Sequence, residues 1–377
     1  MSKLNFLCVL IVAALFCAAV VEGAWTTRQL SPSEVLADQA DMAVFVNNVY
    51  TVWREDTPGN WEIYFRKSID GGSTWQTRQR ITRTAGESRR PAIALDRGTI
   101  YVVWQDDTPG NYEIYFRKST DGGSTWQTMQ RLTTNAGNSE LPSIAVFGSD
   151  IYVTWDDNTP GNYDIYFLKS TDGGATWQTA KRITTNADDS GSSAIVVDGS
   201  YVFMAWASKI SDTNCEIYFK KSIDGGATWQ ATQRLTNNAG VSMDPAVAER
   251  GDNVYVAWQD TTPGNYDIYF RKSTDGGATW NASKKLTANA GNSRNLDMAV
   301  YDANICVAWD DSTPGNEEIY LKKSTDNGAT WQTAQRLTYN SGDSWRPAVA
   351  VSSAKVYVAW DEDVGEWELV FLKYSPL

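Results

Sequence analysis

The sequence predicts an all-β fold, namely a seven-bladed β-propeller built from four-stranded antiparallel blades. Three observations support this prediction. A unit of about 51 residues recurs along the chain, the residues within each unit alternate as they do in strands, and the two chain ends each hold part of one unit. A single four-stranded unit cannot bury both faces of its sheet, so we expect the units to stack radially into a ring.

Two series of tryptophans define the unit. The first series closes a glycine-containing motif and recurs every 51 or 52 residues, at Trp75, Trp126, Trp177, Trp229, Trp280 and Trp331. The second series closes apolar runs such as IYVVW and has seven members, which are Trp53, Trp104, Trp155, Trp206, Trp258, Trp309 and Trp360. The second series therefore predicts seven blades.

Every unit has the same order of segments, and the second unit shows them clearly. The expected strands are PAIAL at 91–95, IYVVW at 100–104, YEIYFRKS at 112–119 and WQTMQRLT at 126–133. None of them has a helical period. The TPGN sequence between the second and third strands supplies proline and glycine where a tight hairpin needs them.

The two chain ends complete each other. The segment WTTRQLS at 25–31 matches the start of a fourth strand, whereas the last unit stops at Leu377 after three strands. We expect the N-terminal strand to complete the last blade, because this pairing removes two open sheet edges. The predicted domain is therefore one closed propeller over 25–377.

The first 24 residues differ from the repeats. An apolar run from Phe6 to Val21 lies between Lys3 and small residues near Ala24, which predicts a signal peptide over 1–24 and a secreted or cell-surface protein. An uncleaved membrane anchor is the alternative, although the run is shorter than the roughly 20 residues of a spanning helix. No later segment is expected to span a membrane.

Charge and composition exclude several classes of function. The net charge is −12 and the acidic residues are spread along the chain, so the surface should repel nucleic acid. The sequence has no histidine, which excludes imidazole-based triads and acid–base catalysis. Cys215 and Cys306 are the cysteines outside the signal segment and are expected to be free thiols. We expect no cofactor and no resident metal.

A short motif, S-x-D-x-G-x-T-W, follows the third strand in six units. It first occurs as Ser68, Asp70, Gly72, Thr74 and Trp75, and it recurs at 119–126, 170–177, 222–229, 273–280 and 324–331. The motif resembles the Asp-box (BNR) repeat, which is known from sialidases and other secreted propellers. With a degenerate seventh copy, the resemblance spans essentially all of 25–377.

We interpret this motif as a structural turn and not as an active site. Its aspartate can accept hydrogen bonds from turn N–H groups, its glycine permits a left-handed backbone, and its tryptophan can bury its ring. Six copies in six blades cannot converge on one substrate, and the resemblance implies the same, because Asp boxes lie away from the sialidase cleft. The six structural aspartates are Asp70, Asp121, Asp172, Asp224, Asp275 and Asp326.

Candidate ligand-binding residues are expected where otherwise similar blades differ. Antiparallel connectivity places the second–third hairpins and the links between blades on one face, here called the top, and the Asp boxes on the bottom. Three tryptophans outside both series, and three arginines near them, are expected on the top: Trp61, Trp345, Trp367, Arg89, Arg90 and Arg346. Aromatic rings suit sugar faces, and arginines can hold a carboxylate or a pair of hydroxyls. Ordinary hairpin packing is the alternative, because other blades carry tyrosine at the position of Trp61.

An acidic residue follows the second-strand tryptophan in every unit except the fourth, where Ser208 replaces it. The series consists of Glu55, Asp106, Asp157, Asp260, Asp311 and Glu362. We expect these carboxylates to cap turn N–H groups, with calcium binding as the alternative. The fourth unit also replaces TPGN with ASKISDTNCE, which indicates either a partner site or drift.

The resemblance implies an exo-sialidase as the enzyme hypothesis. That family uses three arginines on the substrate carboxylate, a Tyr–Glu nucleophile pair and an Asp acid on a six-bladed ring. This sequence predicts seven blades, and no unit carries a long insertion with such a pair. We therefore expect a monomeric, non-catalytic propeller that binds carbohydrate or another extracellular macromolecule, such as a cell-surface protein, through its top face. A sialidase-like hydrolase and a structural or protein-interaction module are the alternatives.

Overall fold

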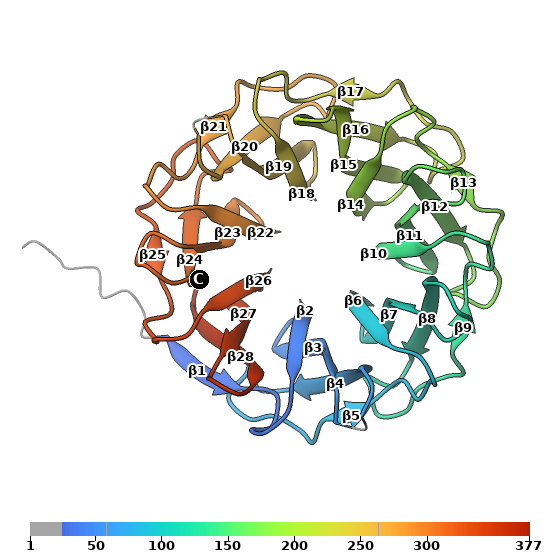
Figure 1. Ribbon diagram of the computed structural model, residues 1–377, viewed down its shortest axis with the longest axis vertical. Coiled ribbons are helices and arrows are strands. Elements are labelled where there is room, and N and C mark those ends of the chain that lie inside the picture. The colour runs from blue at the N-terminus through green and yellow to red at the C-terminus, as the bar shows by residue number, and fades with distance from the viewer. Residues whose placement is uncertain (1–24, 58, 263) are drawn as a thin grey trace, which may run out of the picture.

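The chain folds into a ring of seven four-stranded antiparallel sheets around a central axis (Figure 1). The computed structural model describes residues 25–377 except Pro58 and Pro263, so the predicted signal segment lies outside the described residues. The described part contains strands and no helix. The predicted all-β, seven-bladed propeller is confirmed.

Each blade starts at the axis and adds strands outwards in chain order. Blade 1 comprises β2 (Ala37–Phe45), β3 (Asn48–Glu55), β4 (Glu62–Ser68) and β5 (Gln79–Arg80); blade 2 comprises β6 (Ser88–Asp96), β7 (Thr99–Asp106), β8 (Glu113–Ser119) and β9 (Gln130–Arg131). Blade 3 comprises β10 (Ser139–Phe147), β11 (Asp150–Asp157), β12 (Asp164–Ser170) and β13 (Lys181–Arg182); blade 4 comprises β14 (Ser190–Asp198), β15 (Tyr201–Ser211), β16 (Asn214–Ser222) and β17 (Gln233–Arg234). Blade 5 comprises β18 (Ser242–Arg250), β19 (Asn253–Asp260), β20 (Asp267–Ser273) and β21 (Lys284–Lys285); blade 6 comprises β22 (Ser293–Tyr301), β23 (Asn304–Asp311), β24 (Glu318–Ser324) and β25 (Gln335–Arg336).

Blade 7 joins the two ends of the chain. It comprises β26 (Ser344–Val351), β27 (Lys355–Asp363), β28 (Glu368–Pro376) and the N-terminal strand β1 (Thr26–Gln29), which pairs with β28 antiparallel. The Trp25 indole N–H donates to Gln335 Oε1 of blade 6 at 3.0 Å. Trp177 of an Asp box donates to Gln130 in the same way. Trp25 therefore takes the place of the missing Asp-box tryptophan, and the predicted ring closure is confirmed.

The hydrophobic core lies between neighbouring blades. In the layer between blades 1 and 2, Ile63 and Phe65 pack with Ile100, Val102 and Trp104. The seven second-strand tryptophans are all at most 2% exposed, and each stacks on an aromatic residue of the third strand. Burial of roughly 150–250 Å² per indole contributes several kcal/mol at about 25 cal/mol/Å², as an upper estimate. Blade stacking therefore supplies the stability that one blade lacks.

The outermost strand is shorter than the sequence predicts. In blade 2 the expected strand 126–133 pairs regularly only at Gln130 and Arg131. The side chain of Arg117 donates to the Gln127 carbonyl at 2.6 Å, and Thr133 Oγ1 accepts from the Ile114 N–H at 2.8 Å. These side-chain bonds replace part of the ladder and leave little free sheet edge.

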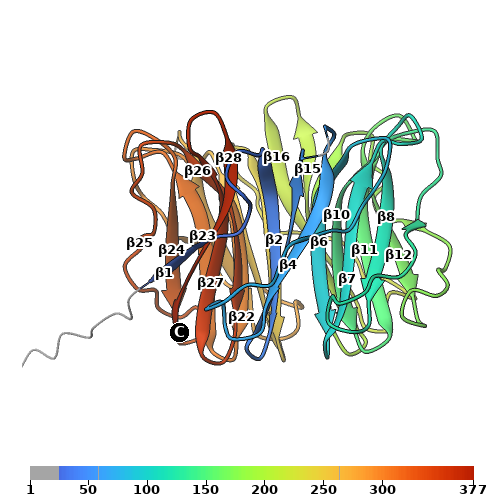
Figure 2. The same ribbon diagram turned by 90° about the horizontal axis from the view of Figure 1, so that it is seen from below.

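The turns separate onto two faces as predicted. On the top face, the hairpin residue Asn60 donates to the Gly86 carbonyl in the following link at 2.8 Å. On the bottom face, the Gly71 N–H of an Asp box donates to the Asn47 carbonyl of the first–second turn at 2.8 Å. Figure 2 shows the hairpins on its upper edge and the Asp-box side, with the C-terminus, on its lower edge.

The Asp boxes form hydrogen-bonded turns. Asp70 accepts from the Thr74 N–H at 2.8 Å, from Thr74 Oγ1 at 2.6 Å and from Ser68 Oγ at 2.7 Å. These hydrogen bonds lower the pKa of Asp70 to about 2, and the bonds from Thr74 have the largest effect. The same bonds recur at Asp224.

Candidate functional site

The innermost strand of every blade has a β-bulge near its top end, and each bulge places one residue in the left-handed region. None of the seven residues is glycine, and their φ values lie between 49° and 57°. The seven are Gln39, Arg90, Leu141, Ser192, Asp244, Asn295 and Arg346. We call them the bulge ring. Such strain persists only where surrounding contacts enforce it, and a bulge can redirect a side chain.

The preceding blade holds five of the seven bulges in place through a side-chain acceptor. The N–H of Ser192 donates to Asp156 Oδ2 at 2.8 Å, and the N–H of Asn295 donates to Gln259 Oε1 at 2.9 Å. The acceptor is in each case the residue directly after a buried second-strand tryptophan. The bulges of Gln39, Leu141 and Arg346 are held in the same way.

Two bulges lack this acceptor and are fastened differently. Arg54 occupies the acceptor position before blade 2, so the Arg90 N–H donates to the Gln39 side chain at 2.9 Å instead. Ala207 occupies it before blade 5, where Ser192 Oγ donates to Asp244 Oδ1 at 2.9 Å. The ring is therefore linked through its own side chains at these two places.

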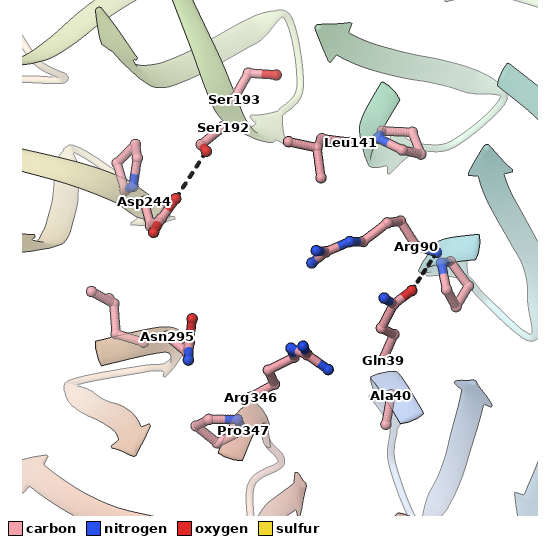
Figure 3. Close-up of a pocket in the computed structure, with 14 residues that line it drawn as sticks. Gln39, Ala40, Arg90, Leu141, Ser192, Ser193, Asp244, Asn295, Arg346 and Pro347 are labelled. Atoms are coloured by element: carbon pink, nitrogen blue, oxygen red, sulfur yellow. Dashed lines mark hydrogen bonds between the residues drawn. The ribbon is translucent and has the colours of Figure 1, made fainter. Parts of the chain in front are cut away.

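The bulge ring surrounds a cavity of about 340 Å³ at the top end of the central axis. Figure 3 shows Gln39, Arg90 and Arg346 directed into this cavity from one side, with Asp244, Ser192 and Asn295 on the other side. We call this cavity the central cup. Its seven equivalent positions carry six residue types. The cup is therefore lined by chemically different side chains from blades that share the same backbone arrangement.

One side of the cup is cationic. Arg346 lies 3.2 Å from Asp38 and 3.5 Å from Asp361, so its charge is largely compensated. The Arg90 guanidinium has no carboxylate within ion-pair distance in the described part of the chain. The residue reaches solvent, but its position in the cup removes part of its hydration. This desolvation, together with the charge of Arg346, lowers the pKa of Arg90, although the guanidinium stays protonated. Arg90 is therefore a cation without an ion-pair partner in an acidic protein.

The opposite side of the cup offers hydrogen-bonding groups. The Gln259 amide donates to Asp244 Oδ2 at 2.8 Å, and Asn295 donates to Asp310 Oδ1 at 2.9 Å. Burial raises the pKa of Asp244. Together with Ser192, these groups present acceptors and donors of the kind that bind sugar hydroxyls.

A second cavity of about 310 Å³ adjoins the cup and is lined by Arg54, Arg89, Arg90, Tyr112 and Glu140, among others. Glu140 accepts a hydrogen bond from the Tyr163 hydroxyl at 2.7 Å. Sequence analysis missed this Tyr–Glu pair, because its members are 23 residues apart and meet only through the pairing of strands within blade 3. Arg89 forms an ion pair with Glu87, and Arg54 with Asp38.

The structure separates the six candidate residues into two groups. Arg90 and Arg346 line the cup, and Arg89 lines the adjoining cavity. The three tryptophans are half-buried at the top ends of blades 1 and 7 and line neither cavity. Trp61 covers the Arg54 guanidinium at 4.0 Å. Trp345 is the second residue of β26 and lies opposite Asp361, not in the preceding link as expected.

The four aspartates of the acidic series cap turn N–H groups, whereas Glu55 and Glu362 accept from side chains. Asp106 accepts from the Thr108 N–H at 2.9 Å, and Asp260 accepts from the Thr262 N–H at 2.8 Å. Among the described residues, no group of three or more His, Cys, Asp or Glu side chains could hold a metal ion. Cys215 and Cys306 are free thiols.

Comparisons with known proteins agree with this fold. The model of the BNR repeat-like domain matches residues 32–212. A sialidase of Bacteroides fragilis (strain YCH46) is 22% identical over 307 residues, which cover 67% of this chain and 55% of the relative. The chain thus spans about half the length of the curated relative it matches.

Solved structures show a similar fold. An ulvan lyase from a polysaccharide lyase family, solved with a GlcA(1-4)Rha3S saccharide, aligns with a TM-score of 0.61 and 12% identity over 88% of this chain and 90% of that one. A Hadza microbial sialidase aligns with a TM-score of 0.54 and 17% identity over 89% of this chain and 74% of that one. The described residues, 25–377 without Pro58 and Pro263, contain no helix that is long and apolar enough to span a membrane.

Proposed function

We propose, from the premise that the chain is an Asp-box (BNR-repeat) β-propeller of sialidase-like fold, that it binds an acidic carbohydrate in the central cup without cleaving it. The bulge ring is the observation that carries the proposal. Seven strained, non-glycine residues present different side chains to one cavity, although the surrounding repeats are closely alike. Drift would have no reason to keep the strain while varying the side chains.

The chemistry of the cup favours an acidic sugar. Arg90 supplies an uncompensated positive charge for a carboxylate, and the opposite side, around Ser192 and Asp244, supplies hydrogen-bonding groups for hydroxyls. A cavity of about 340 Å³ suits a short saccharide end and not an extended protein surface. We further propose that the protein acts outside the cell, secreted or at the cell surface, as the apolar run of residues 6–21 suggests.

Glycan-array binding with two matched arginine variants tests this proposal. Arg90→Gln removes the uncompensated charge, and we expect it to weaken retention of carboxylated glycans by roughly tenfold or more, since hydrogen bonds to charged groups contribute about 1.5–3 kcal/mol. Arg97→Gln removes an exposed arginine from a bottom-face turn and should leave retention unchanged. Equal retention by the wild-type and Arg90→Gln proteins would contradict the proposal.

The tryptophans that the sequence suggests as ligand-binding residues can be tested in the same experiment. Trp345→Ala and Trp367→Ala remove the half-buried rings outside the cup. If the glycan extends across the top of blades 7 and 1, these changes should also weaken retention. Unchanged retention would restrict the site to the cup.

A sialidase-like glycoside hydrolase is the second candidate, and one observation favours it. Tyr163 and Glu140 form a hydrogen-bonded pair beside a cavity lined by three arginines, and the resemblance implies a Tyr–Glu nucleophile. Burial and the hydrogen bond to Glu140 raise the pKa of Tyr163 to about 12, so its hydroxyl keeps the proton at neutral pH. A fluorogenic sialoside assay decides between the two: turnover lost in Tyr163→Phe would favour the hydrolase, and absence of turnover would favour the binding protein.

A further inference from the structure

Blade 4 lacks a carboxylate that the other six blades place on the top side of the second-strand tryptophan. In blade 3, Asp157 Oδ2 accepts from the Trp155 indole at 3.0 Å, from Asn135 at 2.6 Å and from Ser139 at 2.8 Å. Blade 5 repeats this arrangement around Asp260. The carboxylate is thus a buried acceptor on which three donors converge.

In blade 4 the same donors meet only a serine hydroxyl. Asn186 lies 3.0 Å and Ser190 lies 2.9 Å from Ser208 Oγ. The Trp206 indole N–H finds no acceptor among residues 25–377 as far as they are described, although Trp206 is only 2% exposed. In five of the six other blades the equivalent indole donates to its carboxylate, and in blade 2 the buried Trp104 indole has no partner.

A cavity of about 520 Å³ opens at this position. In most other blades the chain turns directly after the carboxylate, and a threonine two residues later donates its N–H to that carboxylate. The Thr159 N–H, for example, donates to Asp157 Oδ1 at 3.0 Å. Blade 4 has Ile210 there, and β15 continues to Ser211 with an irregular pairing between Lys209 and Ser211. Trp206, Ser208, Lys209, Tyr218 and Lys220 line the resulting cavity, which we call the blade-4 pocket.

Lys220 brings an uncompensated cation into this pocket. Its counterparts donate to a backbone carbonyl of the preceding blade, as Lys322 does to Leu286 at 2.6 Å and Arg66 does to Leu30 at 2.7 Å. The equivalent carbonyl would be that of Ile183, but the Lys220 ammonium has no hydrogen-bond or ion-pair partner within the described chain. Lys220 is nevertheless half-buried, and this burial lowers its pKa.

The pocket also exposes an aromatic face. In blade 1 the Arg78 guanidinium lies 5.2 Å from the centre of the Tyr64 ring and forms an ion pair with Glu55 at 2.9 Å. The residue at the position of Arg78 in blade 4 is Thr232. Tyr218, which stacks on Trp206, lines the pocket together with Thr232.

We propose that the blade-4 pocket binds one acidic sugar unit of the uronic-acid type, whose carboxylate takes the place of the carboxylate missing from this blade. The carboxylate accepts the Trp206 indole N–H, Lys220 supplies the compensating charge, and the sugar ring stacks on Tyr218. An acidic peptide would satisfy the charge but would leave the Tyr218 face without a matching apolar surface. The site is separate from the central cup and does not depend on the function proposed there.

Calorimetric titration with methyl β-D-glucuronide, in an Arg90→Gln/Arg346→Gln background that disables the cup, tests this proposal. We expect binding that is on the order of tenfold or more tighter than that of methyl β-D-glucoside. Ser208→Asp restores the residue type of the other blades, so it should fold, raise the melting temperature and abolish glucuronide binding. Lys220→Leu copies Leu168 of blade 3 and should also abolish it.

Matched controls separate the site from general effects. Lys322→Leu makes the same change as Lys220→Leu in blade 6 and should leave glucuronide binding unchanged. Binding that survives Ser208→Asp would overturn the proposal. Equal binding of N-acetylglutamate amide, a mimic of an acidic peptide side chain, would overturn the assignment to a sugar. Because the cup is disabled throughout, neither result depends on the outcome for the cup.

Discussion

The Asp156 side chain joins two blades by a hydrogen bond, and this contact requires a carboxyl group to be buried. It follows the buried Trp155, and it accepts the Ser192 N–H of the next blade at 2.8 Å. Burial raises its pKa to about 8, even though the hydrogen bonds from Ser192 and Ser193 act in the opposite direction. Gln105 and Gln259 make the equivalent bond in other blades without a charge. The bulge therefore needs an acceptor and not a negative charge.

The raised pKa values predict that stability falls as the pH rises from the ordinary carboxyl range towards the folded-state values of about 7 for Asp41 and about 8 for Asp156. A carboxyl group with a folded-state pKa above its unfolded value binds protons more tightly in the folded state, so its stabilising effect is present at low pH and is lost as the pH rises towards the folded pKa. Asp41, with a pKa of about 7 raised by burial, acts in the same direction. We expect a higher melting temperature at pH 6 than at pH 8.5, measured by calorimetry.

Asp156→Asn isolates one contribution to this slope. The amide keeps an oxygen acceptor for the Ser192 N–H and cannot ionise, so the loss of stability between pH 6 and pH 8.5 should become smaller. A variant whose pH profile coincides with that of the wild type would contradict the assignment. Asp70 is a suitable reference residue, because its pKa is lowered and it affects stability only as the pH falls through its titration range near 2.

The Asp box joins six of the seven blades to the preceding blade, and Trp25 makes the equivalent contact between blades 6 and 7. The second glycine of the box has positive φ and lies against an aromatic ring of the preceding blade, as Gly174 does against Phe116. The box aspartate organises the turn, and the glycine allows the close approach. The motif repeats because every blade interface needs the same contact, which is why it carries no catalytic information.

Gly174→Ala should be strongly destabilising. A Cβ at this position would lie 2.7 Å from Phe116 Cε1, and φ is +81°. We expect a loss of about 2–4 kcal/mol in the free energy of unfolding, from backbone strain together with overpacking. Gly148→Ala is the control, since φ is +60° but no atom lies within 4 Å of the added Cβ. Equal losses in urea denaturation of the two variants would show that the contact with Phe116 is unimportant.

At the scale of the whole molecule, the ring is closed by a strand of only four residues. β1 pairs with β28 through Thr26–Gln29, and the Leu30 side chain is 1% exposed within the layer between blades 7 and 1. Closure orients all seven bulges towards one axis, and the central cup exists only while the ring is shut. The binding proposed for the cup therefore depends on contacts at the outer edge of blade 7.

Deletion of residues 25–31 should open the ring. The deletion exposes the edge of β28 and removes the buried Leu30, so we expect a loss of at least about 3 kcal/mol in stability and association through the free edge. Calorimetry and size-exclusion chromatography would detect the two effects. A monomer with an unchanged melting temperature would contradict the closure mechanism.

The sequence by itself determined the seven blades, their closure and the role of the Asp boxes. These features depend on local chemistry, namely strand periodicity, turn glycines and tryptophans repeated every 51 or 52 residues, so they can be predicted without coordinates. Comparison of the repeats also identified Arg90 and Arg346 as candidate ligand-binding residues, and it showed that Ser208 replaces the acidic residue of the other units.

Only the tertiary structure decided how the site is built. The left-handed backbone of Arg90 depends on the Gln39 side chain, 51 residues earlier, and the Tyr163–Glu140 pair meets across separate strands. The unpartnered state of Lys220 is visible only against its counterparts in other blades, which reach a carbonyl of the neighbouring sheet. Contacts between blades are set by the geometry of the ring, and no local pattern encodes them.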